Sequence, residues 1–149
     1  MSLGSIDKTF RTSLRIYSSI ITVAGIGHIA WYWFFPTYNE MTGLTEVQWS
    51  TFYLFNWSIS ILLLFLSILS YLASWTSTLT LTHLRVYSAL TIGFWICRLI
   101  LEFVFPVRIP FVMIPNPSAL FKTLIIIAIL ILAIPELRFR FRKVDSNIK

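Results

Sequence analysis

Charged residues are scarce in this sequence. Asp, Glu, Lys and Arg make up 12% of the 149 residues, whereas 57% are apolar. Soluble proteins carry about 25% charged residues on average, because a chain folded in water needs a polar surface. This chain has too few polar side chains to coat a globule of its length. The composition therefore predicts an integral membrane protein surrounded largely by lipid.

Cysteine is nearly absent as well, because Cys97 is the only one. A single thiol cannot form a disulfide within the chain, a cysteine-based zinc site or a two-cysteine redox relay. The second histidine, His83, falls in a predicted link, whereas His28 falls inside a predicted helix, so a haem held by two histidines is not expected. We predict no metal site, and the sequence leaves any cofactor unknown.

Long apolar stretches are abundant. A helix needs about 20 mostly apolar residues to cross the hydrocarbon core of a membrane. Four stretches come near this length: residues 14–35, 51–73, 86–105 and 118–134. Pro36, Pro106 and Pro135 directly follow three of them, and proline tends to end helices. The sequence predicts an all-α, four-helix transmembrane bundle that forms a single domain over residues 1–149.

Two of the predicted connections differ in composition. Residues 36–50 include Asn39 and Glu40 and are predicted to form a polar loop. Residues 106–117 contain four prolines and are otherwise mostly apolar, which suits neither a regular helix nor a loop in water. We expect this proline-rich segment either to fold over the helices as a lid or to connect them along the membrane interface.

Basic residues are distributed unevenly around the four stretches. Arg108 is the only one in the two connections at residues 36–50 and 106–117, whereas nine lie in the two tails and the remaining link: Lys8, Arg11, Arg15, Arg85, Arg138, Arg140, Arg142, Lys143 and Lys149. Lys and Arg favour the cytoplasmic side of a membrane. Both termini are therefore predicted to be cytoplasmic, in the cell membrane, or the inner membrane of a bacterium. The same placement explains the net charge of +6 by topology and anionic lipids, with no nucleic acid as partner.

Small and hydroxyl-bearing residues recur on one face of the second predicted span. They follow steps of three and four residues: Asn56, Ser60, Leu63, Ser67, Ser70 and Ser74. Ser18, Thr22 and Gly25 form a similar stripe on the first span. Residues of this kind let membrane helices approach closely and hydrogen-bond across the contact. We expect the two stripes to be packing faces.

Four ionisable side chains interrupt the apolar stretches, namely His28, Arg98, Glu102 and Lys122. A charge at the centre of a membrane helix costs about 2.5–3.5 kcal/mol on insertion scales, so such residues are functional candidates. Arg98 and Glu102 are four residues apart and can meet on one face of a helix. This pair would either serve a site or tie the helices together as a structural ion pair.

A rise of about 1.5 Å per residue places these four residues and Asn56 in the outer half of the predicted bundle. We expect them to line a polar pocket that opens towards the outer face, beneath the proline-rich segment. Trp31 and Trp49 would supply aromatic walls or would belong to the aromatic belt at the membrane interface. Lys122 would also fit a side chain that extends outwards to the headgroups.

Residues 15–38, RIYSSIITVAGIGHIAWYWFFPTY, resemble the first helix of DoxX-like small membrane proteins. The matching residues are Arg15, Ala24, Gly25, His28, Pro36 and Tyr38. The resemblance covers about a sixth of the chain, and the interval from His28 to Pro36 is longer than in the usual pattern. It implies a four-helix bundle and an accessory subunit in quinone-linked redox chemistry.

Three functions fit these observations, each with the lipid bilayer as partner. The first is binding of a lipid-soluble molecule, such as a quinone, an isoprenoid or a lipid, by His28, Asn56, Arg98, Glu102, Trp31, Trp49 and Lys122. The second is an enzyme, such as an isomerase, that transfers protons through His28 and Glu102, because histidine titrates near neutral pH. The third is a structural or assembly subunit that binds another membrane protein or a second copy of the chain.

Overall fold

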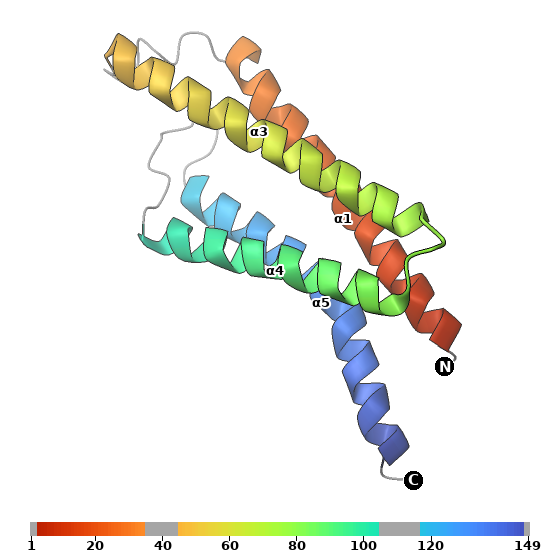
Figure 1. Cartoon of the computed structure of the whole chain (residues 1–149). Coiled ribbons are helices and arrows are strands. Elements are labelled where there is room, and N and C mark those ends of the chain that lie inside the picture. The colour runs from red at the N-terminus through yellow and green to blue at the C-terminus, as the bar shows by residue number, and fades with distance from the viewer. Residues whose placement is uncertain (1–2, 35–44, 105–116, 148–149) are drawn as a thin grey trace. The chain divides into compact units, whose positions relative to one another are not determined.

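The computed structural model describes residues 3–34, 45–104 and 117–147 (Figure 1). Within these ranges, side chains are described except at residues 3, 31–34, 46, 49, 52–53, 117 and 142–147. The described chain consists of four α-helices: α1 (Leu3–Phe34), α3 (Glu46–Trp75), α4 (Leu81–Val104) and α5 (Pro117–Asn147). Each overlaps one predicted span, so the all-α prediction with four helices is confirmed.

Three stretches of these helices are long and apolar enough to cross a membrane: Leu54–Trp75, Leu81–Val104 and Ser118–Phe141. Their length and composition indicate a membrane protein. The described part of α1 is not among them. That residues 14–35 also cross the membrane stays a prediction.

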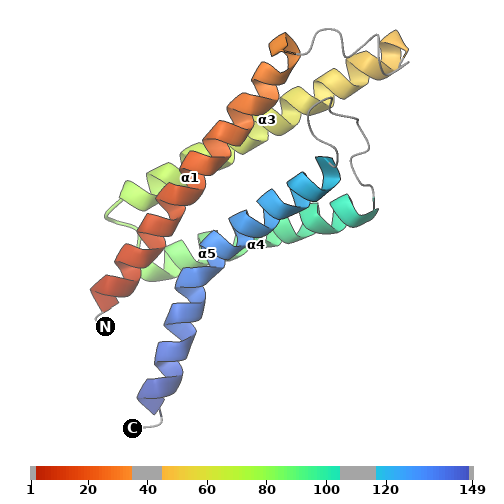
Figure 2. The ribbon, with the colours of Figure 1, turned by 180° about the vertical axis from the view of Figure 1, so that it is seen from behind.

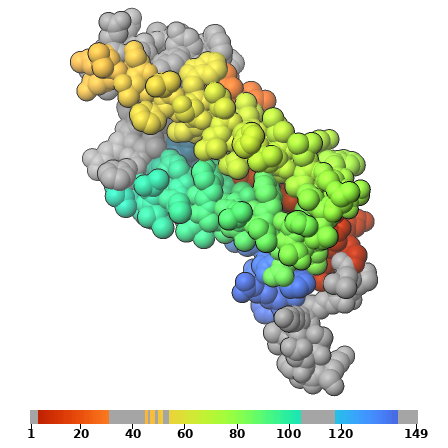
Figure 3. Space-filling model, viewed as in Figure 1, coloured from red at the N-terminus to blue at the C-terminus, as the bar shows by residue number. Residues whose placement is uncertain are grey.

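Many large apolar side chains of α4 are exposed, and Figure 3 shows this helix, in green to cyan, at the surface. Exposed large residues on this helix are Val86, Leu90, Ile96, Ile100, Leu101, Phe103 and Val104. Soluble monomers rarely expose apolar surface that continues along a whole element. The exposed face of α4 is therefore suited to contact lipid tails.

The chain forms two compact units, which are described separately. Unit 1 comprises Met1–Leu14 and Ala73–Lys149, and unit 2 comprises Arg15–Leu72. Unit 1 holds the first turns of α1, the turn between α3 and α4, and both α4 and α5. Unit 2 holds the rest of α1 and most of α3.

In unit 2, α1 and α3 lie side by side, and small residues form their contact (Figures 1 and 2). The Ser18 hydroxyl donates to the carbonyl oxygen of Ser67 at 3.0 Å, and the Ser67 hydroxyl donates to the carbonyl oxygen of Ser18 at 2.9 Å. Thr22 adds a hydroxyl–hydroxyl hydrogen bond with Ser67. Gly25 follows one turn later, where a Cβ atom would lie 3.0 Å from the Leu64 side chain.

Five of the six residues in the predicted stripe of α3 are buried: Ser60, Leu63, Ser67, Ser70 and Ser74. The sixth, Asn56, is half-buried. The prediction that these two stripes are packing faces is confirmed. It succeeds because close approach of two helices requires small side chains at every turn of the contact.

In unit 1, α4 and α5 run antiparallel and lie side by side (Figures 1 and 2). Glu102 and Ser118 meet at the end where the chain leaves α4, and Arg85 and Glu136 meet nearer the other end. One face of α4 is buried along the helix, at Leu84, Ser88, Thr91, Trp95 and Glu102. The steps of three, four and seven residues in this list are those of one helix face.

The prediction that Pro135 ends the fourth helix is wrong. α5 continues through Pro135, and both ribbon views show that it changes direction along its length. Proline cannot donate to the carbonyl oxygen of Ile131, which bends a helix, yet membrane helices tolerate such bends. The next residue, Glu136, forms ion pairs with Arg85 and Arg140. These pairs fasten the segment that follows the proline.

α3 and α4 both begin earlier than predicted, because each has an N-terminal cap. The Thr45 N–H donates to Gln48 Oε1 at 3.0 Å, and the Gln48 N–H donates to Thr45 Oγ1 at 3.3 Å. This reciprocal arrangement is a capping box, so α3 starts at Glu46, inside the predicted polar loop. At α4, the Thr80 hydroxyl lies 2.8 Å from Nδ1 of His83. His83 therefore belongs to a helix and not to a link.

Candidate functional site

Glu102 places a carboxylate in the interior near the end of α4. Its side chain is 0% exposed, and its two oxygens have different partners. Oε1 accepts a hydrogen bond from the Ser118 hydroxyl of α5 at 2.9 Å, and Oε2 lies 2.9 Å from Nη2 of Arg98. The predicted pairing of Arg98 with Glu102 is confirmed. Ser118 adds a link to the next helix that the sequence analysis missed.

Arg98 is covered much less than its partner. Its side chain is 32% exposed, and a guanidinium carries five N–H donors in a planar fork. Removing an ion from water costs several kcal/mol unless its partners compensate the charge. The negative charge of Glu102 is thus compensated within unit 1, whereas the cation beside it still presents surface to its surroundings.

Lys122 lies one turn after Ser118 on α5. Its Nζ atom is 4.5 Å from the centroid of the Phe103 ring, within the range of a cation–π contact. Phe103 directly follows Glu102 along α4. The structure therefore brings Lys122 to the same end of the α4–α5 pair as Arg98 and Glu102.

His28 and Asn56 form a second polar group, between α1 and α3. Nδ2 of Asn56 donates to the carbonyl oxygen of His28 at 2.8 Å, and Oδ1 of Asn56 lies 2.8 Å from Nδ1 of His28. Turning the amide over would place its oxygen against the carbonyl oxygen, so the orientation is fixed by chemistry. Nδ1 therefore carries the proton, and in neutral imidazole the lone pair is on Nε2.

The predicted site residues thus fall into two groups. His28 and Asn56 belong to unit 2, whereas Arg98, Glu102 and Lys122 belong to unit 1. His28 contacts Asn56 within unit 2, and Arg98 contacts Glu102 within unit 1.

Several predicted parts lie outside what the structure describes. They are the side chains of Trp31 and Trp49 and most of the two long connections, residues 36–44 and 106–116, including the predicted lid. Within the described ranges, no three His, Cys, Asp or Glu side chains gather in a way that could hold a metal ion.

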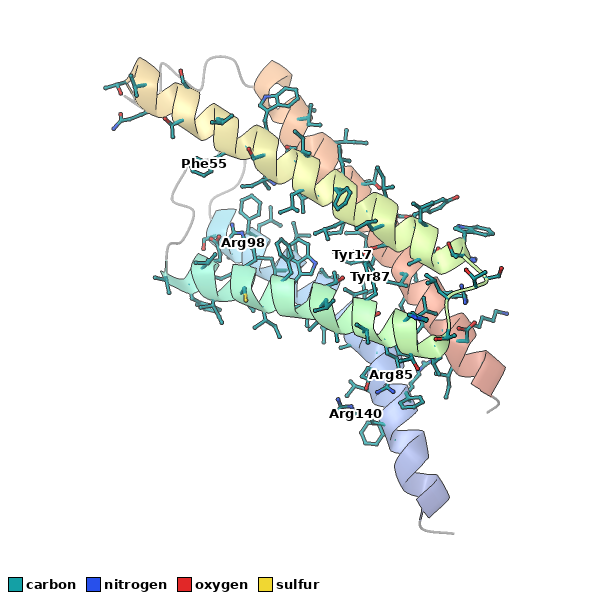
Figure 4. The ribbon with its side chains drawn as sticks, in the orientation of Figure 1. Tyr17, Phe55, Arg85, Tyr87, Arg98 and Arg140 are labelled. Atoms are coloured by element: carbon teal, nitrogen blue, oxygen red, sulfur yellow. The ribbon has the colours of Figure 1, made fainter. Side chains whose placement is uncertain are left out.

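An ion cluster that was not predicted lies towards the other end of α4, where Figure 4 shows Arg85 and Arg140. Arg85 binds Glu136 through two hydrogen bonds, from Nε at 2.8 Å and from Nη2 at 2.7 Å. Arg140 adds a third at 3.0 Å, and the Arg85 guanidinium lies 4.0 Å from the centroid of the Phe139 ring. Arg85 and Arg140 were counted only as topology signals. The isolated acidic residue in a strongly basic segment was the available clue.

A second missed contact closes the turn between α3 and α4. The Arg11 guanidinium donates to the carbonyl oxygens of Thr76 and Leu79, both at 2.9 Å. Nε of Arg11 also lies 2.8 Å from Oδ2 of Asp7. The four-residue spacing of Asp7 and Arg11 was visible in the sequence, but the distant carbonyl partners were not.

The fold and these polar groups define a small all-α protein in which three helices can cross a membrane and the buried carboxylate has partners on two helices. No family model, curated protein or solved structure matches the chain. The resemblance of residues 15–38 to DoxX-like proteins therefore stays a prediction.

Proposed function

We propose that this chain is a multi-pass protein of the cell membrane that binds the polar end of a lipid-soluble molecule through α4 and α5. Three helices of sufficient length and apolar character support the membrane location. Arg98 and Glu102 would face the polar end of the ligand. The exposed apolar side chains of α4 would accompany its apolar part.

The partial exposure of Arg98 carries this proposal. A purely structural ion pair in an apolar medium is most stable when both ions are covered and all their donors have acceptors. Glu102 meets this condition, but 32% of the Arg98 side chain remains exposed. A carbonyl or anionic oxygen of a ligand would accept hydrogen bonds from the guanidinium. Because a charge within an apolar membrane helix costs free energy, its presence points to a function.

Native mass spectrometry of gently purified protein, combined with lipid analysis, tests the proposal. The test variant replaces both ions, Arg98→Met together with Glu102→Gln, so that neither is left unpaired. We expect the parent protein to carry a stoichiometric lipid-soluble molecule and the folded double variant to lose it. Arg138→Gln, at an exposed residue of α5, is the control and should keep it.

Retention of the molecule by the double variant would show that the ion pair serves only to hold α4 and α5. A second polypeptide in the spectrum of the parent, without a small molecule, would instead favour an assembly subunit.

A second candidate function is proton transfer by His28. Its contact with Asn56 favours this function, because it places the ring proton on Nδ1, so that the lone pair of the neutral imidazole is on Nε2. Gln in place of His28 still forms hydrogen bonds but does not titrate. We expect His28→Gln to fold like the parent but to lose proton transfer, measured as exchange of the bound molecule's protons with deuterated solvent. Equal exchange in the parent and the variant would exclude this role.

A further inference from the structure

We propose that the polar end recognised by α4 and α5 is an anionic phosphate group held between Arg98 and Lys122. This inference rests on the proposed function and deepens it, because it names the chemistry of the ligand's polar end. It is carried by the level at which the two cations lie and by the charge balance around them.

The contact between α4 and α5 places the two cations at one level. The helices are antiparallel (Figure 1), and Ser118 donates to Glu102 across the pair at 2.9 Å. Arg98 lies four residues before Glu102, and Lys122 lies four residues after Ser118. The Cα atom of each is therefore about 6 Å along its helix from this contact and in the same direction. Residues four apart share a helix face, so Arg98 lies on the face of α4 that carries Glu102, and Lys122 lies on the face of α5 that carries Ser118.

Positive charge is in excess at this level. Arg98 and Lys122 contribute two cations and Glu102 one carboxylate, which leaves one positive charge over. The Phe103 ring attracts the Lys122 ammonium but supplies no negative charge.

The other carboxylates described in unit 1 are engaged elsewhere. Asp7 pairs with Arg11, and Glu136 pairs with Arg85 and Arg140. Neutralisation of the excess charge at Arg98 and Lys122 by one of them would break an ion pair that already exists. An anion from outside the chain would neutralise it without that loss.

Phosphate fits the two cations better than a neutral carbonyl does. The planar guanidinium of Arg98 can bind two oxygens of one phosphate, and the compact ammonium of Lys122 acts as a point charge on a third. The positive end of the α5 helix dipole, at Ser118, favours an anion in the same region. A quinone carbonyl would leave the excess charge uncompensated, which is costly in an apolar medium.

Thermal unfolding of the purified protein in detergent micelles, with three added probes, tests the inference. The probes are hexadecyl phosphate, hexadecanol and inorganic phosphate. We expect hexadecyl phosphate to raise the unfolding temperature and to bind at least about fivefold more tightly than hexadecanol, since one cation near an anionic headgroup contributes about this factor. The advantage should shrink as the salt concentration rises.

Three variants locate the effect. Lys122→Gln leaves Glu102 paired with Arg98, so the variant should fold, and it should lose about fivefold in affinity for hexadecyl phosphate but none for hexadecanol. The double variant Arg98→Gln with Glu102→Gln should remove the preference for phosphate. Arg138→Gln is the matched control on α5 and should bind all three probes as the parent does.

The outcomes separate this inference from the proposed function. Equal binding of hexadecanol and hexadecyl phosphate, lost in the double variant, would preserve the proposed function and overturn the phosphate inference. Stabilisation by inorganic phosphate as strong as that by hexadecyl phosphate would preserve phosphate recognition but make free phosphate the ligand. Binding of none of the probes, or equal losses in Arg138→Gln and Lys122→Gln, would overturn phosphate recognition at this place.

Discussion

At the scale of single residues, two glycines of α1 have very different surroundings. A Cβ atom at Gly25 would lie 3.0 Å from two atoms of the Leu64 side chain and 3.4 Å from the carbonyl oxygen of Ser60, whereas a Cβ atom at Gly27 would have nothing within 4 Å. Both positions lie in the same helix, so substitution by alanine gives the same gain in helix propensity. Any difference between the two substitutions reports packing of α1 on α3.

We expect Gly25→Ala to lower the stability of the protein by about 1–3 kcal/mol, because Leu64 must move to admit the methyl group. Gly27→Ala should be neutral or slightly stabilising. Thermal unfolding of both variants in the same detergent measures the difference. Equal unfolding temperatures would mean that α1 and α3 do not make this close contact.

The ion pair on α4 gives a second prediction at this scale. Arg98→Met should cost about 3–5 kcal/mol, because it leaves the fully buried carboxylate of Glu102 without its cation. Adding Glu102→Gln should restore much of the folded yield. The control is Arg140→Gln, since Arg140 is 74% exposed and Glu136 keeps Arg85; we expect it to cost less than about 1 kcal/mol. Single and double variants that unfold like the parent would contradict the burial of this pair.

Sequence spacing predicted one ion pair within a helix, Arg98 with Glu102, and missed the contacts that join two helices. Arg98 and Glu102 are one turn apart, so helix geometry alone brings them together. Ser118 reaches Glu102, and Arg85 reaches Glu136, only because α4 and α5 adopt one particular register. No local pattern specifies that register, which follows from the packing of both helices.

At the scale of helices and turns, Arg11 holds the connection between α3 and α4. Its guanidinium binds two carbonyl oxygens of this turn, from Thr76 and Leu79. We expect Arg11→Gln to increase backbone amide exchange around residues 76–80 about tenfold, because hydrogen bonds from a charged donor contribute about 1.5–3 kcal/mol. Lys8→Gln, at an exposed residue of the same helix, is the control for loss of charge.

Hydrogen exchange measured by mass spectrometry resolves this turn from the helices on either side. Equal protection in the two variants would show that the turn holds its shape without Arg11.

Helix existence followed from apolar content, but the helix ends did not. Pro135 lacks a donor, yet α5 continues, because its neighbour Glu136 is held by two arginines. The start of α3 depends on reciprocal hydrogen bonds between Thr45 and Gln48. A helix boundary predicted from apolar residues alone does not take these bonds into account. The ends of helices are set by a few specific hydrogen bonds and ion pairs, whereas the existence of a helix depends on the summed apolar character of many side chains.

At the scale of the whole molecule, the distribution of basic residues predicts that both ends of the chain face the cytoplasm. Reporter domains fused after Lys149 and inserted at Gly43 should therefore report opposite sides of the membrane. If both reporters appear on the same side, an even number of crossings separates Gly43 from Lys149 and the four-span topology is wrong. A reporter fused before α1, compared with the one at Gly43, tests whether α1 crosses the membrane.

Composition was sufficient to predict a helical membrane protein, because the scarcity of charge leaves few alternatives. The spacing of residues in the sequence could not show whether His28 and Glu102 share a pocket, because that depends on how two pairs of helices meet. The chemistry of a ligand is harder still to predict, because the same few charged side chains can bind several kinds of polar group. The charge balance around Arg98 and Lys122 bears on the choice among these polar groups only when the pairing of α4 with α5 is known.

The hydroxyl groups of the helices bear on how the protein is made. Many donate to the carbonyl oxygen four residues earlier in their own helix, as at Ser58, Ser60, Ser70, Thr91 and Thr123. A helix bonded in this way can leave the translocon before its neighbours have been synthesised. Arg98 and Glu102 can likewise neutralise each other within α4. Arg85 must wait for Glu136, so this ion pair forms only after the last helix has been synthesised.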